Sequence, residues 1–284
     1  MNLLPDIECW LLQQGHHAPF RATSISGGNI CDSYRLDTGD GKRYFVKQKA
    51  AAPLSFFSAE AAGLRAIATT NTISTPKVFH FSSSFLLLEY LPVTSQHHNY
   101  WQTFAEQLAS MHRITMPCFG FSMDNYCGST AQPNPNSANG HDFFAQHRLL
   151  YQSQLAYGQG LLTAQDMIFV ERLCYRLADL IPVQPACLVH GDLWSGNHHP
   201  GRQGRATLID PACYWGWAET DIAMTKLFGG FPEIFYQHYH QHNPFQADWE
   251  ERMDIYNLYH LLNHLNLFGH SYYAQVAIIL KRYQ

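Results

Sequence analysis

A ten-residue segment, LVHGDLWSGN, constrains this chain more than any other part of its sequence. It starts at Leu188 with a short apolar run, then sets a carboxylate, Asp192, and an amide, Asn197, across a four-residue gap. A second apolar run follows and ends at another carboxylate, Asp210. Phosphoryl transfer needs one acid to orient the attacking hydroxyl, and an amide with a second acid to hold magnesium on the nucleotide. The segment and the run that follows it together supply these groups.

Each of these residues also has an ordinary structural interpretation. His-Gly-Asp alone suits a turn between a strand and a helix, Asn197 suits a turn, and Asp210 suits a cap. The joint spacing favours chemistry, because H-G-D-x-x-x-x-N followed by D-P-A repeats the order of a kinase catalytic loop and its D-F-G segment. We therefore predict Asp192 as the base, Asn197 and Asp210 as magnesium ligands, and His190 as a brace that hydrogen-bonds the backbone near Asp210.

Composition sets the class of the protein. The 284 residues are 46% hydrophobic and 14% charged, which is typical of a globular chain. A net charge of -4 argues weakly against a nucleic-acid partner. The sequence has no run of about 18 apolar residues, so we predict no membrane span. We also predict no signal peptide, because the basic region that begins one does not precede Asp6 and Glu8. The seven cysteines form no C-x-x-C pair, so we expect a reducing, cytoplasmic setting. The sequence does not give the oligomeric state, for which we favour a monomer.

The first part of the chain, residues 1–91, predicts a small antiparallel β lobe that binds the nucleotide. Alternating segments between turn signals predict strands, and an Ala-rich run predicts one helix packed on the sheet. The expected elements are a short helix at Ile7–Gln14, three strands within 22–49, a helix at Ser58–Ala68, and strands at Val78–Phe81 and Phe85–Glu89.

Residues 92–284 predict a larger, mainly helical lobe that carries catalysis and substrate binding. Helical periodicity and two short buried strands surround the Asp192 loop, while residues 125–140 are rich in Asn, Pro, Ser and Gly and predict a loop. The whole is an α+β chain of two lobes with a ligand cleft between them. The expected helices are 101–112, 143–157, 164–180, 221–228, 232–242 and 249–268, and the strands are 188–189 and 207–209.

Lys47 and Glu60 are the predicted phosphate clamp. Lys47 lies in the strand-like run YFVKQ, and Glu60 follows on the next helix. A Lys–Glu pair of this kind holds the phosphates in kinases. An isolated lysine would more often be a solvated residue of an edge strand, and a glutamate on an Ala-rich helix is ordinary. Because Asp192, Asn197 and Asp210 follow downstream, we nevertheless favour a phosphate-binding role for Lys47.

Three further segments have weaker signals. Gly27, Gly28 and Asn29 lie between two strands, where glycines let the backbone approach phosphates, although an ordinary hairpin turn explains them too. Glu89, Tyr90 and Leu91 end the small lobe and can offer backbone groups to an adenine, or simply join the lobes. Asp221 can brace the catalytic loop through backbone amides, or cap a helix.

With these residues in hand, the chain resembles the fructosamine (ketoamine) kinase family, a branch of the protein-kinase-like fold beside the aminoglycoside and choline kinases. The H-G-D-L-W-S-G-N run and the L-F-G-G-F run are the most specific. The resemblance covers nearly the whole chain, through the segments 25–28, 44–47, 57–64, 88–91, 124–133, 190–197, 209–212, 221–231 and 258–269.

The resemblance implies ATP- and Mg²⁺-dependent phosphorylation of the third-carbon hydroxyl of a sugar ketoamine, free or protein-linked. The product is unstable, so the activity is a deglycating repair. It also implies that Trp194 and the 125–130 loop, with Asn125, lie at the sugar. The chain departs from the family pattern at His198-His199-Pro200, at Trp215 and Trp217, and at Asn29, where many relatives carry cysteine. We expect Trp217 at the substrate mouth, and thiol-based control does not carry over directly to Cys31.

Two alternatives stay open. A kinase of the same fold could act on another small hydroxylated amine, such as an aminoglycoside or choline. A non-enzymatic pseudokinase would require the loss of a catalytic group, yet all of them are present. Protein kinase activity fits poorly, because no A-P-E segment follows Asp210.

Overall fold

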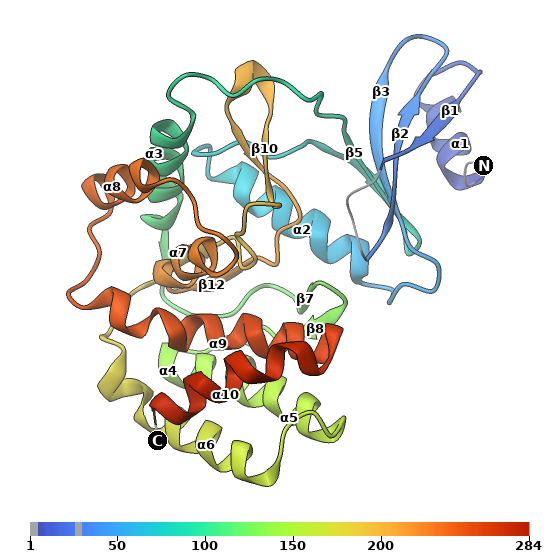
Figure 1. The fold of residues 1–284 in the computed structure, drawn as a ribbon. Coiled ribbons are helices and arrows are strands. Elements are labelled where there is room, and N and C mark those ends of the chain that lie inside the picture. The colour runs from blue at the N-terminus through green and yellow to red at the C-terminus, as the bar shows by residue number, and fades with distance from the viewer. Residues whose placement is uncertain (1–4, 26–29, 284) are drawn as a thin grey trace.

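The structure is a computed structural model that describes residues 5–25 and 30–283. It has a small β lobe beside a larger helical lobe (Figure 1). The small lobe is a five-stranded antiparallel sheet in the order β1-β2-β3-β5-β4. Its strands are β1 (Arg21–Ser24), β2 (Asp32–Asp37), β3 (Arg43–Gln48), β4 (Val78–Phe81) and β5 (Phe85–Glu89).

Helices cover both faces of this sheet. The expected helix, α2 (Phe56–Thr69), packs Phe57 and Leu64 against one face. The N-terminal helix, α1 (Pro5–Gln13), buries Ile7 and Leu11 against the other face. Apolar side chains are therefore buried on both faces of the sheet, and the small lobe has hydrophobic clusters of its own.

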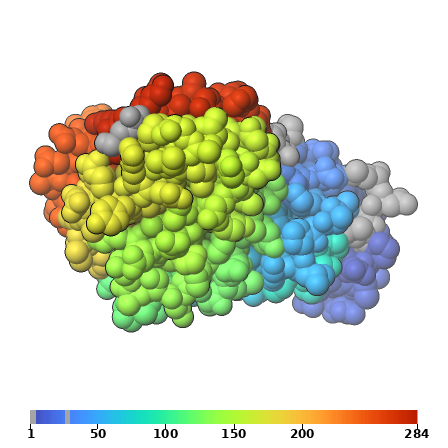
Figure 2. All heavy atoms as spheres, turned by 90° about the horizontal axis from the view of Figure 1, so that it is seen from below, coloured from blue at the N-terminus to red at the C-terminus, as the bar shows by residue number. Residues whose placement is uncertain are grey.

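The larger lobe is mainly helical, and α9 (Trp249–Phe268) is the longest of its described helices. Figure 2 shows that the helical segments within residues 140–180 gather on one face of this lobe, with the small lobe at one side. Its other helical segments are α3 (Tyr100–His112), α4 (Gly140–Phe144), a π-helical turn (Ala145–Leu150), α5 (Tyr151–Gly158), α6 (Ala164–Leu180), α7 (Ala218–Leu227), α8 (Glu233–His242), α10 (Tyr273–Arg282), and 3₁₀ turns at Arg202–Gly204 and His270–Tyr272.

Short strands connect these helices and hold the loops of the cleft. A three-stranded sheet has the order β12-β9-β6, and two hairpins pair β7 with β8 and β10 with β11. The strands are β6 (Thr115–Met116), β7 (Asn125–Cys127), β8 (Thr130–Gln132), β9 (Ala186–Val189), β10 (His198–Pro200), β11 (Ala206–Leu208) and β12 (Tyr214–Gly216).

One expectation was wrong: residues 125–140 are not loop throughout. Cys127 pairs with Thr130, so Gly128 and Ser129 form a two-residue hairpin turn. Gly128 has φ +65°, a conformation that glycine adopts at little cost. The β7–β8 hairpin therefore projects an ordered edge toward the cleft.

The start of α6 illustrates how local chemistry fixes an element. The Thr163 hydroxyl accepts from the Asp166 amide at 3.2 Å, and the Asp166 carboxylate accepts from the Thr163 amide at 2.8 Å. This capping box satisfies two amides that the helix itself leaves unpaired. Within the described part of the chain, no helix combines the length and apolar character needed to cross a membrane.

Candidate active site

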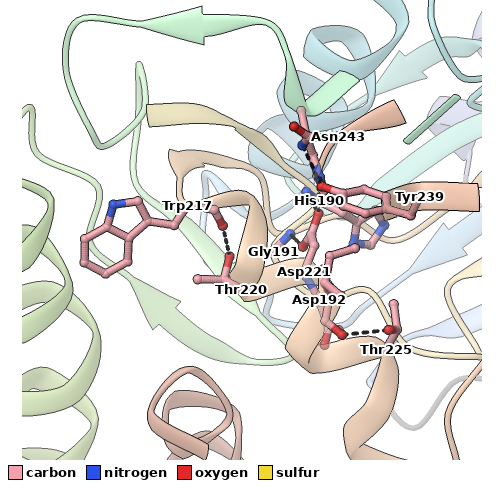
Figure 3. A network of polar contacts seen from close by, with 11 residues as sticks. His190, Gly191, Asp192, Trp217, Thr220, Asp221, Thr225, Tyr239 and Asn243 are labelled. Atoms are coloured by element: carbon pink, nitrogen blue, oxygen red, sulfur yellow. Dashed lines mark hydrogen bonds and ion pairs between the residues drawn. The ribbon is translucent and has the colours of Figure 1, made fainter. Parts of the chain in front are cut away.

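The loop after β9 is held rigidly by a buried carboxylate. Asp221, 1% exposed, accepts from the His190 amide at 2.7 Å and the Gly191 amide at 2.9 Å (Figure 3). Gly191 has φ +81°, and a Cβ there would lie 2.1 Å from the carbonyl oxygen of Ala212. Only glycine fits this turn. The expected bracing role of Asp221 agrees with this geometry.

His190 fixes the same loop from its side chain. Its Nε2 lies 2.9 Å from the carbonyl oxygen of Ile209, to which it donates. The predicted contact with the backbone beside Asp210 is confirmed. It ties the Asp192 loop to the residue that follows β11, so the two acidic side chains are positioned together.

Asp192 and Asn197 are in direct contact. The Asn197 side-chain amide donates to the Asp192 carbonyl at 2.8 Å and to its carboxylate at 3.0 Å. Because Nδ2 is turned to Asp192, the Oδ1 of Asn197 is left as an acceptor. Burial raises the pKa of Asp192 to about 7; the bond from Asn197 opposes the shift, and the charges of Asp210 and Asp221 add to it. Such a carboxylate is suited to accept a proton.

Lys47 joins the two lobes electrostatically. Its ammonium lies 2.7 Å from Glu60 Oε1 and also forms an ion pair with the Asp210 carboxylate. Lys47 is 7% exposed, and burial alone would lower its pKa. The charges of Asp210 and Glu60 outweigh burial and raise the pKa, so the lysine is cationic. The structure thus brings the predicted clamp, Lys47 and Glu60, to the predicted metal ligand Asp210.

Asp210 has a backbone conformation that is uncommon for a non-glycine residue. Its φ of +54° is in the left-handed region, which aspartate tolerates better than most residues. Strain of this kind is held only where the surroundings determine it, and it concentrates at functional sites. Here the turn directs the carboxylate toward Lys47.

These residues line one cleft of about 570 Å³ between the lobes. This size is in the range of small-molecule sites. Among the described residues, the cleft brings together ten of the predicted site residues: Lys47, Glu60, Glu89, Tyr90, Leu91, Asn125, Asp192, Trp194, Asn197 and Asp210.

The linker residues Glu89 to Leu91 border the cleft as expected. The Glu89 carboxylate does not point freely into it, because it accepts from the Arg202 Nε at 2.9 Å and from the Lys77 amide at 3.2 Å. Arg202 belongs to the turn of the β10–β11 hairpin. The hairpin is therefore bonded to the linker, and the Glu89 carboxylate is already occupied by contacts within the protein.

Trp194 and Asn125 differ in what they can offer a substrate. Trp194 is 38% exposed at the cleft. Its ring packs so closely over Gly196 that a Cβ on residue 196 would lie 2.3 Å from a ring carbon. Asn125 is 3% exposed. Its amide donates to the Cys213 carbonyl at 2.7 Å, and its oxygen accepts from Gln132 at 2.7 Å. Asn125 thus shapes the cleft wall, while Trp194 is free to contact a ligand.

Trp217 is not where the sequence analysis expected it. It is 3% exposed, packs against Phe119, Phe144 and Tyr256, and is absent from the cleft lining formed by the described residues. Figure 3 shows it pointing away from Asp192. Its indole fills the core between α4 and α7, so it has no access to the substrate mouth.

The predicted glycine turn, Gly27, Gly28 and Asn29, lies outside the described residues. Cys31, just after it, lines the cleft. Burial raises the pKa of the Cys31 thiol to about 11, against the opposing charge of Lys47. The thiol is therefore protonated at neutral pH.

Sequence reasoning missed the residues that hold Asp221. His112 Nε2 lies 3.1 Å from the Asp221 carboxylate, and its Nδ1 lies 2.7 Å from the Tyr239 hydroxyl. Asn243 donates to that hydroxyl at 2.9 Å. Because a carboxylate only accepts, His112 donates through Nε2. His112 is more than a hundred positions from both Asp221 and Tyr239 in sequence, and no local motif connects it to them.

The family follows from comparison with known proteins. The sequence model of the fructosamine kinase family matches residues 7–284. The chain belongs to the fructosamine kinase family. Among its relatives, a probable ketoamine kinase of Synechocystis sp. is 44% identical over 272 residues, covering 93% of this chain and 91% of that protein. A chloroplastic protein-ribulosamine 3-kinase of Arabidopsis thaliana is 34% identical over 287 residues, covering 96% and 86%.

Solved structures agree with this assignment. A Thermobifida fusca crystal structure, provisionally assigned as a fructosamine-3-kinase, has a TM-score of 0.90 at 27% identity and covers 99% of each chain. An ADP-bound aminoglycoside phosphotransferase has a TM-score of 0.61 at 17% identity, covering 98% of this chain and 97% of that one, which shows the fold alone. The resemblance and the two-lobe, protein-kinase-like α+β fold are confirmed. This fructosamine kinase family member is a phosphotransferase that acts on a hydroxyl group, and its family implies ATP use.

Replacing Lys47 with methionine should disable nucleotide handling. The variant keeps most of the side-chain volume but removes the cation between Glu60 and Asp210. We expect kcat/KM for ATP to fall by about 10²–10³-fold, as for loss of a fixed charge that stabilises a transition state. Steady-state kinetics at varied ATP measure this. The matched control is Lys77→Met, because Lys77 is an exposed lysine beside Phe79. Equal losses of kcat/KM in both variants would contradict a specific role of Lys47 in binding the phosphates.

Proposed function

We propose that this chain transfers the γ-phosphate of ATP to the third-carbon hydroxyl of sugar ketoamines, the adducts of fructose or ribulose type that sugars form with amines. The observation that carries the proposal is one cleft in which Asp192 and Asn197 of the H-G-D-L-W-S-G-N loop face Asp210 and Lys47. Relatives named ketoamine kinase and protein-ribulosamine 3-kinase support the substrate class.

In this proposal Asp192 is the catalytic base. It orients the sugar hydroxyl toward the γ-phosphorus and takes its proton as the new O–P bond forms and the bond to the ADP oxygen breaks. Lys47, oriented by Glu60, binds phosphate oxygens. Most of the rate then comes from positioning and charge stabilisation, since no covalent enzyme intermediate is needed.

The donor set near Asp192 fits a magnesium ion. The Oδ1 of Asn197 and the carboxylate of Asp210 are oxygen donors on the same cleft, and Mg²⁺ prefers one or two such ligands together with phosphates and water. We propose that Asn197 and Asp210 hold it. The ion would neutralise charge on the nucleotide phosphates, while Asn197 also keeps its hydrogen bonds to Asp192.

The charge of the cleft favours a ketoamine over a polycationic aminoglycoside, the alternative substrate. Among the described lining residues the carboxylates are Glu60, Glu89, Asp192 and Asp210. Lys47 pairs with two of them and Arg202 with a third. Little uncompensated negative charge is left to attract a polycation. We place Trp194 against the sugar, where an indole offers a flat apolar face beside the reacting hydroxyl.

The proposed role is the repair of glycated amines, because the phosphorylated ketoamine is unstable and releases the amine. The lobe boundary at residues 91 and 92, a monomeric state and a cytoplasmic location stay predictions alongside it.

Phosphate transfer to a defined ketoamine tests the function. With Mg-ATP and fructosyl-lysine or ribulosyl-lysine, we expect one ADP per product, with phosphorus NMR placing the phosphate on the third sugar carbon. The 3-deoxy analogue, which lacks the acceptor hydroxyl, is the control and should give no transfer. Phosphorylation of an aminoglycoside or choline in the same panel, with every ketoamine inert, would sink the proposal.

A further inference from the structure

A sulfur and a nitrogen ligand converge on a carboxylate oxygen of Asp192, the proposed base. Cys127 Sγ, a carboxylate oxygen of Asp192 and a ring nitrogen of His260 all lie within 4.8 Å of one another. They come from three separate elements: strand β7, the loop after β9, and helix α9. Cys127 and Asp192 both line the cleft, so two of the three groups lie at its wall.

One ring nitrogen of His260 has no hydrogen-bond partner among the described residues. The residue is 3% exposed, and its Nδ1 is fully buried with no hydrogen-bond partner within the described parts of the chain. Buried polar atoms are nearly always paired, so an unpaired one requires an explanation. Burial, with the charges of His264 and Arg148, lowers the pKa of His260 to about 3. The imidazole is therefore neutral, the form that binds metals.

Cys127 supplies the sulfur of the set from strand β7. It is 2% exposed, and its backbone carbonyl accepts from the Asn263 side chain at 3.2 Å, which ties β7 to α9 one turn from His260. Burial, with the charge of Asp192, raises the pKa of the Cys127 thiol well above its usual range. Without a metal the thiol keeps its proton, so metal binding must release it.

We propose that Cys127, Asp192 and His260 form a binding site for a zinc-class transition metal, and that its occupancy inhibits the enzyme. Thiolate, imidazole and carboxylate are ligands of Zn²⁺ in three-ligand sites with an open fourth position. Mg²⁺ prefers oxygen ligands and does not select a thiolate. Zinc bond lengths set ligand atoms about 3.3–3.8 Å apart, so side-chain shifts of about 1 Å close the site.

The inhibition rests on the proposed function, whereas the metal site does not. Binding is Cys–SH plus M²⁺ giving Cys–S⁻–M²⁺ plus H⁺, with Asp192 ionised and His260 neutral. A metal-bound Asp192 no longer offers its lone pair to the substrate hydroxyl. The site shares Asp192 with catalysis but does not use Asn197 or Asp210, so Mg-ATP and the inhibitory metal have separate ligands.

Cobalt absorbance tests the site without any kinase assay. Co²⁺ added to the full chain should give a thiolate-to-metal band in the near ultraviolet and tetrahedral bands in the visible. Cys127→Ala and Cys127→Ser should lose the thiolate band and weaken Co²⁺ and Zn²⁺ affinity by at least about tenfold. Cys31→Ala, another cysteine of the same cleft, is the matched control and should keep the band.

Two results would overturn the site: a thiolate band that persists in both Cys127 variants, or one that Cys31→Ala removes. The inhibition is tested separately, with free Zn²⁺ fixed by a metal buffer and each variant compared with its own zinc-free rate. We expect the Cys127 variants to need at least tenfold more free Zn²⁺ for half inhibition. Equal inhibition of all variants would contradict the mechanism. If no ketoamine is phosphorylated at all, the proposed function fails while the cobalt result still decides the site.

Discussion

Asp192→Asn should lower kcat for ketoamine phosphorylation by about 10³–10⁴-fold while leaving Mg-ATP binding nearly unchanged. The amide keeps the shape of the carboxylate and can still accept from the Asn197 side chain, now 3.0 Å away. It cannot accept the proton of the sugar hydroxyl, and general-base catalysis contributes about 10²–10⁴-fold. Steady-state rates at saturating substrates give kcat, and calorimetry with a non-hydrolysable ATP analogue gives the nucleotide affinity.

The matched control is the same change at an exposed position. Asp142→Asn alters the first turn of α4, where the residue is exposed, and should leave kcat within about twofold because surface changes of this kind cost little. If Asp192→Asn kept more than a tenth of the wild-type kcat, another group would have to be the base. If it instead lost nucleotide binding, Asp192 would belong to the phosphate site.

Much of the fold follows from local pattern. The predicted bounds of β4, β5, α6 and α9 are those observed. Each of these elements has strong punctuation in the sequence: three serines separate β4 from β5, a Thr-x-x-Asp box starts α6, and Ile181-Pro182 follows its end. Caps, turns and apolar periodicity act over a few residues, so the sequence displays them directly.

The elements that escaped prediction are those that tertiary contacts define. Strands β6 and β12 have two and three residues and exist through their pairing with β9. The β7–β8 hairpin lies in a run of polar turn residues, where only Gly128-Ser129 signals a turn. The helix expected from 143 to 157 contains a π-helical turn at Ala145–Leu150, which intrinsic propensity does not distinguish from α-helix.

The site divides in the same way. Sequence spacing predicted which groups of the Asp192 loop meet, since Asp192 and Asn197 are only five positions apart. The Lys47–Glu60 contact was predicted by the strand-helix order that kinases share. Trp217 was placed wrongly because nothing local tells a cleft tryptophan from a core one. The meeting of Cys127 with His260 depends on how α9 packs against β7, and the sequence has no signal for it.

Asp221→Asn should destabilise the larger lobe by about 3 kcal/mol or more. The carboxylate accepts from two backbone amides and from His112, all buried. An asparagine has one acceptor oxygen, so its NH₂ group must face a buried donor. Breaking a buried charge network costs about 3–5 kcal/mol. Urea unfolding measures the loss, and kcat should fall with it because the His190–Gly191 turn positions Asp192. Asp254→Asn, which breaks a half-exposed pair with Arg282, is the control and should cost under about 1 kcal/mol.

The pH dependence separates the charge of Asp221 from its packing. Burial opposes ionisation, but the hydrogen bond and charge of His112, with the His190 amide, outweigh it and hold the pKa of Asp221 below its ordinary value of 3.8. The ionised carboxylate therefore stabilises the fold fully above that value, and the stabilisation is lost as pH falls through the lower, folded pKa. The stability gap between wild type and Asp221→Asn should be constant from about pH 5 to 8 and narrow below about pH 4. A gap that held its size at pH 3 would mean that the shape of Asp221, and not its charge, holds the His190–Gly191 turn in place.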